Sequence, residues 1–238
     1  MTQFKSWAKT DTGAVRKHNE DNLLSRPDLG LWVVADGAGG HDSGDLASGM
    51  IVEALNHLDA RLSAAALLSE IRLTISRVHD ALRSEAAARG GNAMIASTFV
   101  SLLIRDGHFA CLWAGDSRAY RLRGGILQQL SRDHSLVQEL VDSGNLAAED
   151  AESHPHANVI TRAVGSDSET LELEKVIGPI EPGDRFLLCS DGLSKTLSAA
   201  EIASLLGASE GVPPPELLIT AALAQQVKDN VTAVVIEV

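Results

Sequence analysis

Apolar residues recur along this chain at two spacings, one typical of strands and the other typical of helices. Short runs that are apolar or alternating predict strands. These runs lie at residues 3–9, 31–35, 97–104, 108–114, 119–123, 126–130, 171–177, 185–190 and 231–238. The dipeptides Asp106-Gly107 and Gly124-Gly125 are typical of hairpin turns, and they separate strands in the middle of the chain. The pattern therefore predicts antiparallel sheets.

Apolar residues at helical spacing predict a pair of long amphipathic helices over residues 43–62 and 64–89. Shorter helices are predicted at residues 133–143, 147–152, 198–206 and 216–226. Ser198 and Glu201 match a capping box, which marks the start of one of them. Strands, a helix pair, further strands and late helices together predict an α+β fold with helices outside antiparallel sheets.

Composition narrows the class of protein. The chain has 238 residues, of which 45% are apolar, which is enough for one domain or two small ones. Its net charge of −12 argues against nucleic acid as a partner. Cys111 and Cys189 lie inside apolar runs without CxxC spacing, which indicates core thiols in a reducing compartment. We find no secretion signal and no apolar stretch of about 18 residues, so we expect a cytoplasmic protein with no membrane span.

The stretch at residues 31–41, LWVVADGAGGH, is the first candidate for chemistry. A buried-strand pattern ends at Asp36, and Gly37 follows with further glycines at positions 39 and 40. Glycine lets the backbone approach a ligand closely, so the Asp36 carboxylate and the Gly37 carbonyl are candidates for holding a hard cation. His41 adds a group that titrates near neutral pH. The alternative is a strand that ends in an ordinary glycine turn.

An acid at a strand end recurs along the chain. Asp116, Asp191 and Asp229 each lie beside a predicted strand end, and Asp21 follows Glu20 near the first strands. Carboxylates that converge from separate strands can bind a divalent cation. Because the sequence has no Cys or His cluster, Mg²⁺ or Mn²⁺ fits this donor set better than Zn²⁺. The alternative is that each Asp is a turn residue.

Five short motifs occur in order and carry a family resemblance. They are Arg16-x-x-Asn19-Glu20-Asp21, Asp36-Gly37-x-Gly39-Gly40-His41, Gly115-Asp116-Ser117-Arg118, Ser190-Asp191-Gly192-Leu193 and Asp229-Asn230-x-Thr232. This set resembles the metal-dependent serine/threonine protein phosphatases, the protein phosphatase 2C-like (PPM) family, and the compact length resembles its bacterial members. Residues 131–135 and 161–165 also resemble segments of this family.

The resemblance implies a fold and a domain organisation. The implied fold is a four-layer αββα sandwich, in which two antiparallel sheets are flanked by helix pairs. A single catalytic domain would span residues 1–238, with a flap-like insertion at about residues 131–165 that shapes substrate choice. The active site would lie at one end, between the sheets.

The resemblance also implies a role for each motif residue. The implied metal ligands are Asp36, which bridges two ions, the carbonyl of Gly37, Asp191 and Asp229 on one ion, Glu20 or Asp21 on the other, and Asp116 on a third, weaker ion. Arg16 would bind the phosphate, because a guanidinium can hold two phosphate oxygens. The alternative for Arg16 is a solvated surface residue. His41 would act as the general acid that protonates the leaving group.

The implied activity is hydrolysis of phosphoserine and phosphothreonine in proteins by a water activated between two Mn²⁺ or Mg²⁺ ions. The implied partners are phosphorylated proteins, including a bacterial serine/threonine kinase and its targets, in signalling or secretion-system control. The chain departs from the family at Ala38, where Met is usual, and at Lys195, where an acid or Asn is common. A cation at position 195 would weaken the third metal site or replace part of its charge.

Three other functions stay open from the sequence. The first is a two-metal hydrolase of small phosphate esters or nucleotides. The second is a non-catalytic module of the same fold that senses a ligand or a partner kinase, although the retained Asp36, Asp191 and Asp229 argue against it. The third is a structural domain with acidic turns. A thiolate phosphatase is not favoured, because neither cysteine lies in a CxxxxxR arrangement.

Overall fold

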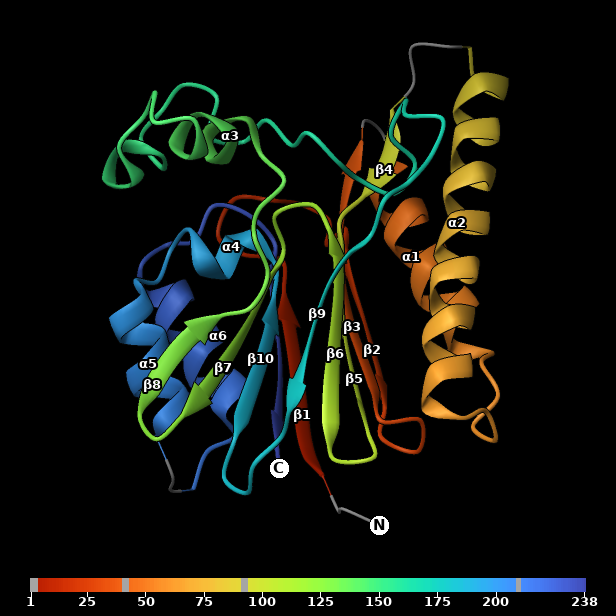
Figure 1. Cartoon of the computed structure of the whole chain (residues 1–238). Helices are drawn as coiled ribbons and strands as arrows, with labels where there is room; N and C mark the ends of the chain where they lie inside the picture. The colour runs from red at the N-terminus through yellow and green to blue at the C-terminus, as the bar shows by residue number, and fades with distance from the viewer. Residues whose placement is uncertain (1–3, 40–42, 91–93, 209–210) are drawn as a thin grey trace.

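The computed structural model of the chain describes residues 4–39, 43–90, 94–208 and 211–238. Two antiparallel sheets stack against each other, and helices cover the outer face of each sheet (Figure 1). The predicted α+β sandwich of two antiparallel sheets flanked by helices is therefore confirmed.

Each sheet combines strands from distant parts of the chain. The first sheet has the order β1 (Lys5–Asp11), β11 (Val231–Glu237), β10 (Arg185–Cys189), β7 (Arg118–Arg123) and β8 (Ile126–Gln129). The second has the order β2 (Asp21–Arg26), β3 (Leu31–Gly39), β5 (Phe99–Arg105), β6 (His108–Ala114) and β9 (Glu174–Pro179), and the short β4 (Ile95–Ser97) pairs with β3. Because paired strands are antiparallel, the start of one strand lies beside the end of its neighbour.

Helices form the two outer layers. α1 (Ser43–Asn56) and α2 (Ala64–Ala88) cover the second sheet, and α5 (Ala199–Gly207) and α6 (Pro214–Ala224) cover the first (Figure 1). The short α4 (Asp191–Ser194) follows β10 directly. None of the described helices is long and apolar enough to cross a bilayer.

A segment at residues 131–165, called the flap below, contains α3 (Leu136–Asp142) and the 3₁₀ turn η1 (Ala148–Asp150). Figure 1 shows α3 at the same end of the sandwich as α4. The segment predicted as an insertion therefore lies over the end of the sheets at which several motif residues are found.

Strand periodicity places alternate side chains of one strand in two different cores. In β3, Leu31 and Val33 pack in the core that also contains α1 and α2, whereas Trp32 packs in the core between the sheets. Both faces of the strand are buried, which explains why its sequence is continuously apolar rather than alternating. β11 is buried on both faces in the same way.

Several element boundaries differ from the sequence-based ones. The strand predicted at residues 97–104 is interrupted at Thr98, whose hydroxyl accepts a hydrogen bond from the backbone of Asp36. The helix predicted over residues 43–62 ends at Asn56, and residues 21–26, expected only to lead toward a strand, pair with β3. These boundaries depend on contacts with residues that are remote in sequence. The spacing of apolar residues along the chain cannot predict such contacts.

Replacing Phe186 with Ala should lower the free energy of unfolding by about 3–5 kcal/mol. The ring is fully buried between the sheets and packs on Phe109, with 5.2 Å between the ring centroids. Ile126→Ala serves as the control, because Ile126 is 73% exposed and its loss should change stability by about 0.5 kcal/mol or less. Urea denaturation followed by circular dichroism measures both values, and equal losses would contradict the assignment of the inter-sheet core.

Candidate functional site

Asp36 lies near the end of β3, opposite Asp21 of β2 in the strand register. Thr98 holds its backbone from the other side. The Thr98 hydroxyl accepts the Asp36 N–H at 3.0 Å, and the Thr98 N–H donates to the Asp36 carbonyl at 2.8 Å. The Ser97 hydroxyl donates to the same carbonyl at 3.0 Å. The sheet itself, rather than an irregular turn, therefore positions this acid.

Other acids surround the Asp36 carboxylate. Burial raises the pKa of Asp36 well above the usual range for Asp, and the negative charges of neighbouring acids raise it further. These neighbours are Asp21, Asp191, Asp116 and Asp229. The structure thus brings near one another the aspartates that the sequence places at separate strand ends.

Asp21 is buried, with 5% of its surface exposed. Its Oδ2 accepts hydrogen bonds from the hydroxyls of Ser190 at 2.8 Å and Thr232 at 2.7 Å. Its Oδ1 is buried without a hydrogen-bond partner among the described residues. Burial is the main cause that raises the pKa of Asp21 to about 7, and the two hydroxyls oppose the rise.

Asp116 follows Gly115 at the end of β6. Gly115 has a φ of +112°, and a Cβ at this position would lie 2.7 Å from the side chain of Thr98, so glycine is required for this close approach. Asp116 is 3% exposed, and its Oδ1 has no hydrogen-bond partner in the described part of the chain. Burial and the charge of Asp191 raise the pKa of Asp116 to about 6, against the opposing effect of Lys195.

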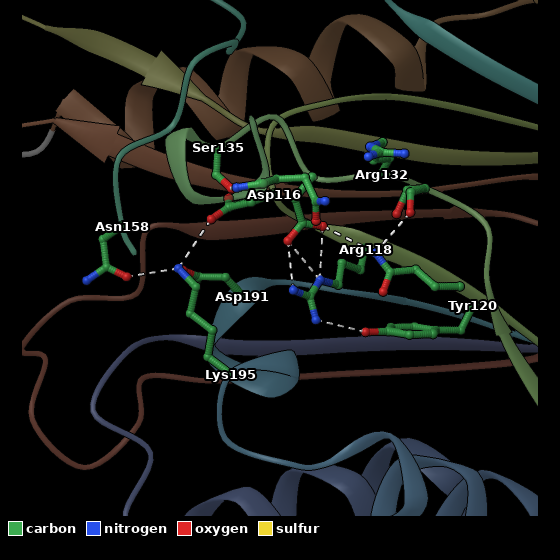
Figure 2. Close-up of polar contacts among 12 residues, drawn as sticks. Asp116, Arg118, Tyr120, Arg132, Ser135, Asn158, Asp191 and Lys195 are labelled. Carbon is green, nitrogen blue, oxygen red and sulfur yellow. Dashed lines mark hydrogen bonds and ion pairs between the residues drawn. The ribbon is translucent and has the colours of Figure 1, made fainter. Parts of the chain in front are cut away.

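The ammonium of Lys195 lies between two of the acids (Figure 2). Its Nζ donates to Asp191 Oδ2 at 2.7 Å and to Asp116 Oδ2 at 3.3 Å. Asp191 is the first residue of α4, so Lys195 follows one helical turn later on the same side. The cation that the sequence singled out therefore contacts both acids directly.

Arg16 forms an ion pair with Asp229, with 2.8 Å between Nη2 and Oδ2. Both side chains are about half-exposed, at 52% and 42%. The Asn230 side chain holds the loop of Arg16 against the start of β11, because it accepts the Glu20 N–H at 2.9 Å and donates to the His18 carbonyl at 2.9 Å. The predicted phosphate-binding residue thus lies beside one of the predicted metal ligands.

Gly37 lies where no side chain would fit. A Cβ at this position would lie 2.1 Å from the carbonyl oxygen of Gly44 in α1. The Gly37 N–H donates to the carbonyl of Glu20 at 3.1 Å, which places the backbone of Glu20 beside β3. His41, the predicted general acid, lies outside the described residues.

The polar side chains that hold these acids received no role from the sequence. Ser190, Asn230 and Thr232 lie within the motifs, so their place in the motifs could have indicated a role for them. Thr98 lies in an apolar run that carried no such signal, yet its hydroxyl bonds the Asp36 backbone and lies 2.7 Å from the Ser117 hydroxyl. Sequence reasoning identified the acids and missed the groups that orient them.

The donor set fits a divalent cation that prefers oxygen ligands. Asp21 and Asp116 each bury a carboxylate oxygen that is costly to leave unpaired. As the side chains stand, however, no three acidic, His or Cys residues in the described ranges are close enough to one point to hold an ion. Arg16 and Lys195 engage individual acids instead. Binding an ion therefore requires some of these side chains to rearrange.

Comparisons with known proteins point to a single family. The family model described as protein phosphatase 2C matches residues 14–226. The chain is 33% identical over 237 residues to the serine/threonine phosphatase stp of Listeria monocytogenes, which covers 96% of this chain and 94% of that protein.

Solved structures agree with the sequence comparisons. PppA, described as a key regulatory component of T6SS in Pseudomonas aeruginosa, is 44% identical with a TM-score of 0.91, and the match covers 99% of this chain and 98% of PppA. The catalytic domain of the serine/threonine protein phosphatase PstP, in complex with 2 manganese ions, is 32% identical with a TM-score of 0.87, and the match covers 98% of this chain and 97% of that one.

Asp21 and Asp116 should make the metal-free protein less stable as the pH rises from about 4 to about 7. An unfolded Asp loses its proton near pH 3.9, whereas folded Asp116 and Asp21 keep theirs up to about 6 and about 7. In this window the folded state binds more protons than the unfolded state, so each rise in pH costs stability through these groups. Thermal unfolding in chelator, measured at each pH, tests the sign.

The Asp21→Asn variant isolates this effect from the other acids of the chain. Its melting temperature in chelator should fall less with rising pH than that of the wild type. Added Mn²⁺ should stabilise the wild type more at pH 7 than at pH 5, because metal binding displaces protons from its ligands. Identical pH slopes for the wild type and the variant would contradict a buried, proton-holding Asp21.

Proposed function

The chain belongs to the protein phosphatase 2C family and is a metal-dependent serine/threonine protein phosphatase, and we propose that its active site is the group of aspartates around Asp36. One observation carries the proposal: aspartates from separate segments gather around Asp36, since Asp21 lies opposite it in the strand register and the charges of all four neighbours raise its pKa. Such a concentration of negative charge is unfavourable by itself and becomes favourable when cations bind.

The proposed cofactor is a pair of Mn²⁺ or Mg²⁺ ions. Asp36 would contribute to both ions and Gly37 would contribute its carbonyl. Asp191 and Asp229 would hold one ion, and Glu20 or Asp21 would support the other. The relative that holds 2 manganese ions supports this number. When bound, the ions supply positive charge that neutralises phosphate oxygens and lowers the pKa of water in the site.

Arg16 would orient the phosphate of the substrate. Its guanidinium is half-exposed beside Asp229, and its paired N–H donors match two oxygens of one phosphate group. The assignment of His41 as the acid that protonates the leaving Ser or Thr oxygen stays a prediction.

Water is the nucleophile that the chain favours. Both cysteines are fully buried, at 0% exposure. Burial raises the pKa of Cys189 to about 12 and raises that of Cys111 as well, so neither thiol is available as a thiolate. A covalent thiolate mechanism is therefore not supported.

Phosphorylated proteins are the substrates of this family. We propose that those of this chain include a serine/threonine kinase and its targets, in signalling or in control of a secretion system. The similarity to PppA, a regulatory component of T6SS, supports the second setting. We further propose that residues 1–238 form one catalytic domain whose flap shapes substrate choice. A cytoplasmic location stays a prediction.

Phosphate release from a phosphothreonine peptide should require Mn²⁺ and stop when a chelator is added. Asp36→Asn should lower the metal-dependent rate by a factor on the order of 10³, because it removes charge from the proposed ion-binding centre. Asp80→Asn serves as the matched control, since Asp80 lies exposed on α2 and its loss should leave the rate unchanged. Wild-type turnover in Asp36→Asn would refute the assignment.

A stability measurement separates loss of the site from loss of the fold. Asp36→Asn replaces an acid whose charged form is disfavoured by burial and by neighbouring acids, so the metal-free variant should melt at or above the wild-type temperature. Hydrolysis of p-nitrophenyl phosphate without hydrolysis of any phosphopeptide would favour the alternative of a small-ester hydrolase.

Arg16→Ala should raise KM for the phosphopeptide about tenfold and change kcat less, because it removes a charge-assisted contact to the phosphate. Lys17→Ala is the control, since Lys17 is the next cation in the same loop and no site role is proposed for it. Steady-state kinetics at saturating Mn²⁺ measures both constants. An unchanged KM in Arg16→Ala would remove this residue from the phosphate site.

A further inference from the structure

The ammonium of Lys195 has polar partners from three parts of the chain (Figure 2). Besides Asp191 at 2.7 Å and Asp116 at 3.3 Å, it donates to Asn158 Oδ1 at 2.9 Å. An ammonium has three N–H donors, so these contacts account for all of them. The protein therefore supplies its own cation at this point of the active site.

The two ion pairs of Lys195 are largely shielded from water, whereas its hydrogen bond to Asn158 is exposed. The side chain of Lys195 is 26% exposed, that of Asp191 18% and that of Asp116 3%. Removing one partner of a shielded ion pair leaves an uncompensated charge, which is strongly destabilising. Without Lys195, Asp116 would be a buried carboxylate near a second carboxylate, with no counter-charge in contact among the described residues.

A divalent cation bound between Asp116 and Asp191 would need the space that the ammonium occupies. Magnesium or calcium binds carboxylate oxygens at about 2.0–2.6 Å, and Lys195 already contacts Oδ2 of both acids. A second cation would also be repelled by the charge of Lys195. The third ion predicted at Asp116 therefore conflicts with this geometry.

Asn158 connects the same ammonium to the flap. The flap is braced at this point, because the Val159 carbonyl accepts the N–H of Leu136 at 2.9 Å, at the start of α3. Ile160 also forms a bridge with Ser135, the residue before α3. A contact at Asn158 is therefore transmitted to α3 through the backbone.

Lys195 borders two hollows that the flap also lines. Asn158 lines one hollow of about 400 Å³, together with Asp191 and Asp229. Glu152 lines the other, of about 410 Å³. A change in the flap would therefore alter the hollow beside Asp191 and Asp229 and a second hollow beside Lys195.

We propose that Lys195 is a positioning residue that takes the place of a third divalent cation between Asp116 and Asp191 and anchors the flap to the active site through Asn158. The inference rests on the proposed function, because Asp191 is also a proposed ligand of the two-ion centre. It follows that the enzyme works with two ions and that its flap position does not depend on a third.

Metal counting tests the first half of the proposal. Equilibrium dialysis against Mn²⁺ followed by elemental analysis, with calorimetric titration alongside, should give two Mn²⁺ per wild-type chain, the number in the PstP complex. Lys195→Met should bind one further, weaker ion. Lys195→Arg keeps a cation and should stay at two. Lys228→Met is the matched control, because Lys228 lines the same hollow as Asp191 and should also stay at two.

Hydrogen exchange tests the second half. Amides at residues 154 and 156–160 should exchange on the order of tenfold faster in Lys195→Met and in Asn158→Ala than in the wild type. Peptides from β5 and β6 should be unchanged. Asn158→Ala should release the flap and still bind two Mn²⁺. This variant therefore tests the anchoring role of Lys195 separately from its role in place of a third ion.

The outcomes distinguish this inference from the proposed function. Binding of three Mn²⁺ by the wild type, or of two Mn²⁺ by Lys195→Met, would overturn the proposal that Lys195 takes the place of a third ion. Amide exchange in Asn158→Ala at the wild-type rate would overturn the proposal that Asn158 anchors the flap to Lys195. If Lys195→Met fails to fold without metal, the ion count of the wild type and of Lys195→Arg and the exchange of Asn158→Ala still decide both points. Absence of any Mn²⁺ binding by the wild type would overturn the proposed two-ion site itself.

Discussion

Repulsion among aspartates gathered at one end of the sandwich is the interaction on which the site depends. Burial and neighbouring negative charge raise the pKa values of Asp36, Asp21 and Asp116 together. Folding places these groups near one another at a cost, which the apolar packing on both faces of the sheets offsets. The same cost would favour cation binding at the proposed site, because a divalent ion would relieve the repulsion that the folded chain maintains.

The acids keep their places because their backbones belong to paired strands or lie directly beside them. Antiparallel register sets Asp21 opposite Asp36. The hydroxyls of Ser190 and Thr232 then hold one oxygen of Asp21 and leave the other without a partner in the described chain. These donors are neutral and form no ion pair with Asp21, so its second oxygen would be open to an ion in the proposed site.

Among the described residues, Arg16 and Lys195 contact the grouped aspartates, and the two pairings differ in exposure. The pair of Arg16 with Asp229 is half-exposed, and pairs of that kind contribute little to stability. In the proposed site the guanidinium would therefore exchange Asp229 for a phosphate at small cost. Lys195 forms two largely shielded ion pairs and an exposed hydrogen bond to the flap, so it is suited to fixing an arrangement rather than binding a substrate.

The sequence by itself determined the fold class and the family and singled out the acids as candidates, because strand periodicity, turn residues and ordered motifs are local features. The contact of Lys195 with Asp191 also follows from helical spacing, since four residues separate them. Tertiary structure alone decided that the same ammonium reaches Asp116, 79 residues away, and Asn158, 37 residues away. It likewise decided that Thr98 interrupts a strand to hold Asp36. Such contacts depend on how the sheets and the flap pack against one another. The spacing of residues along the chain does not predict which remote residues this packing brings into contact.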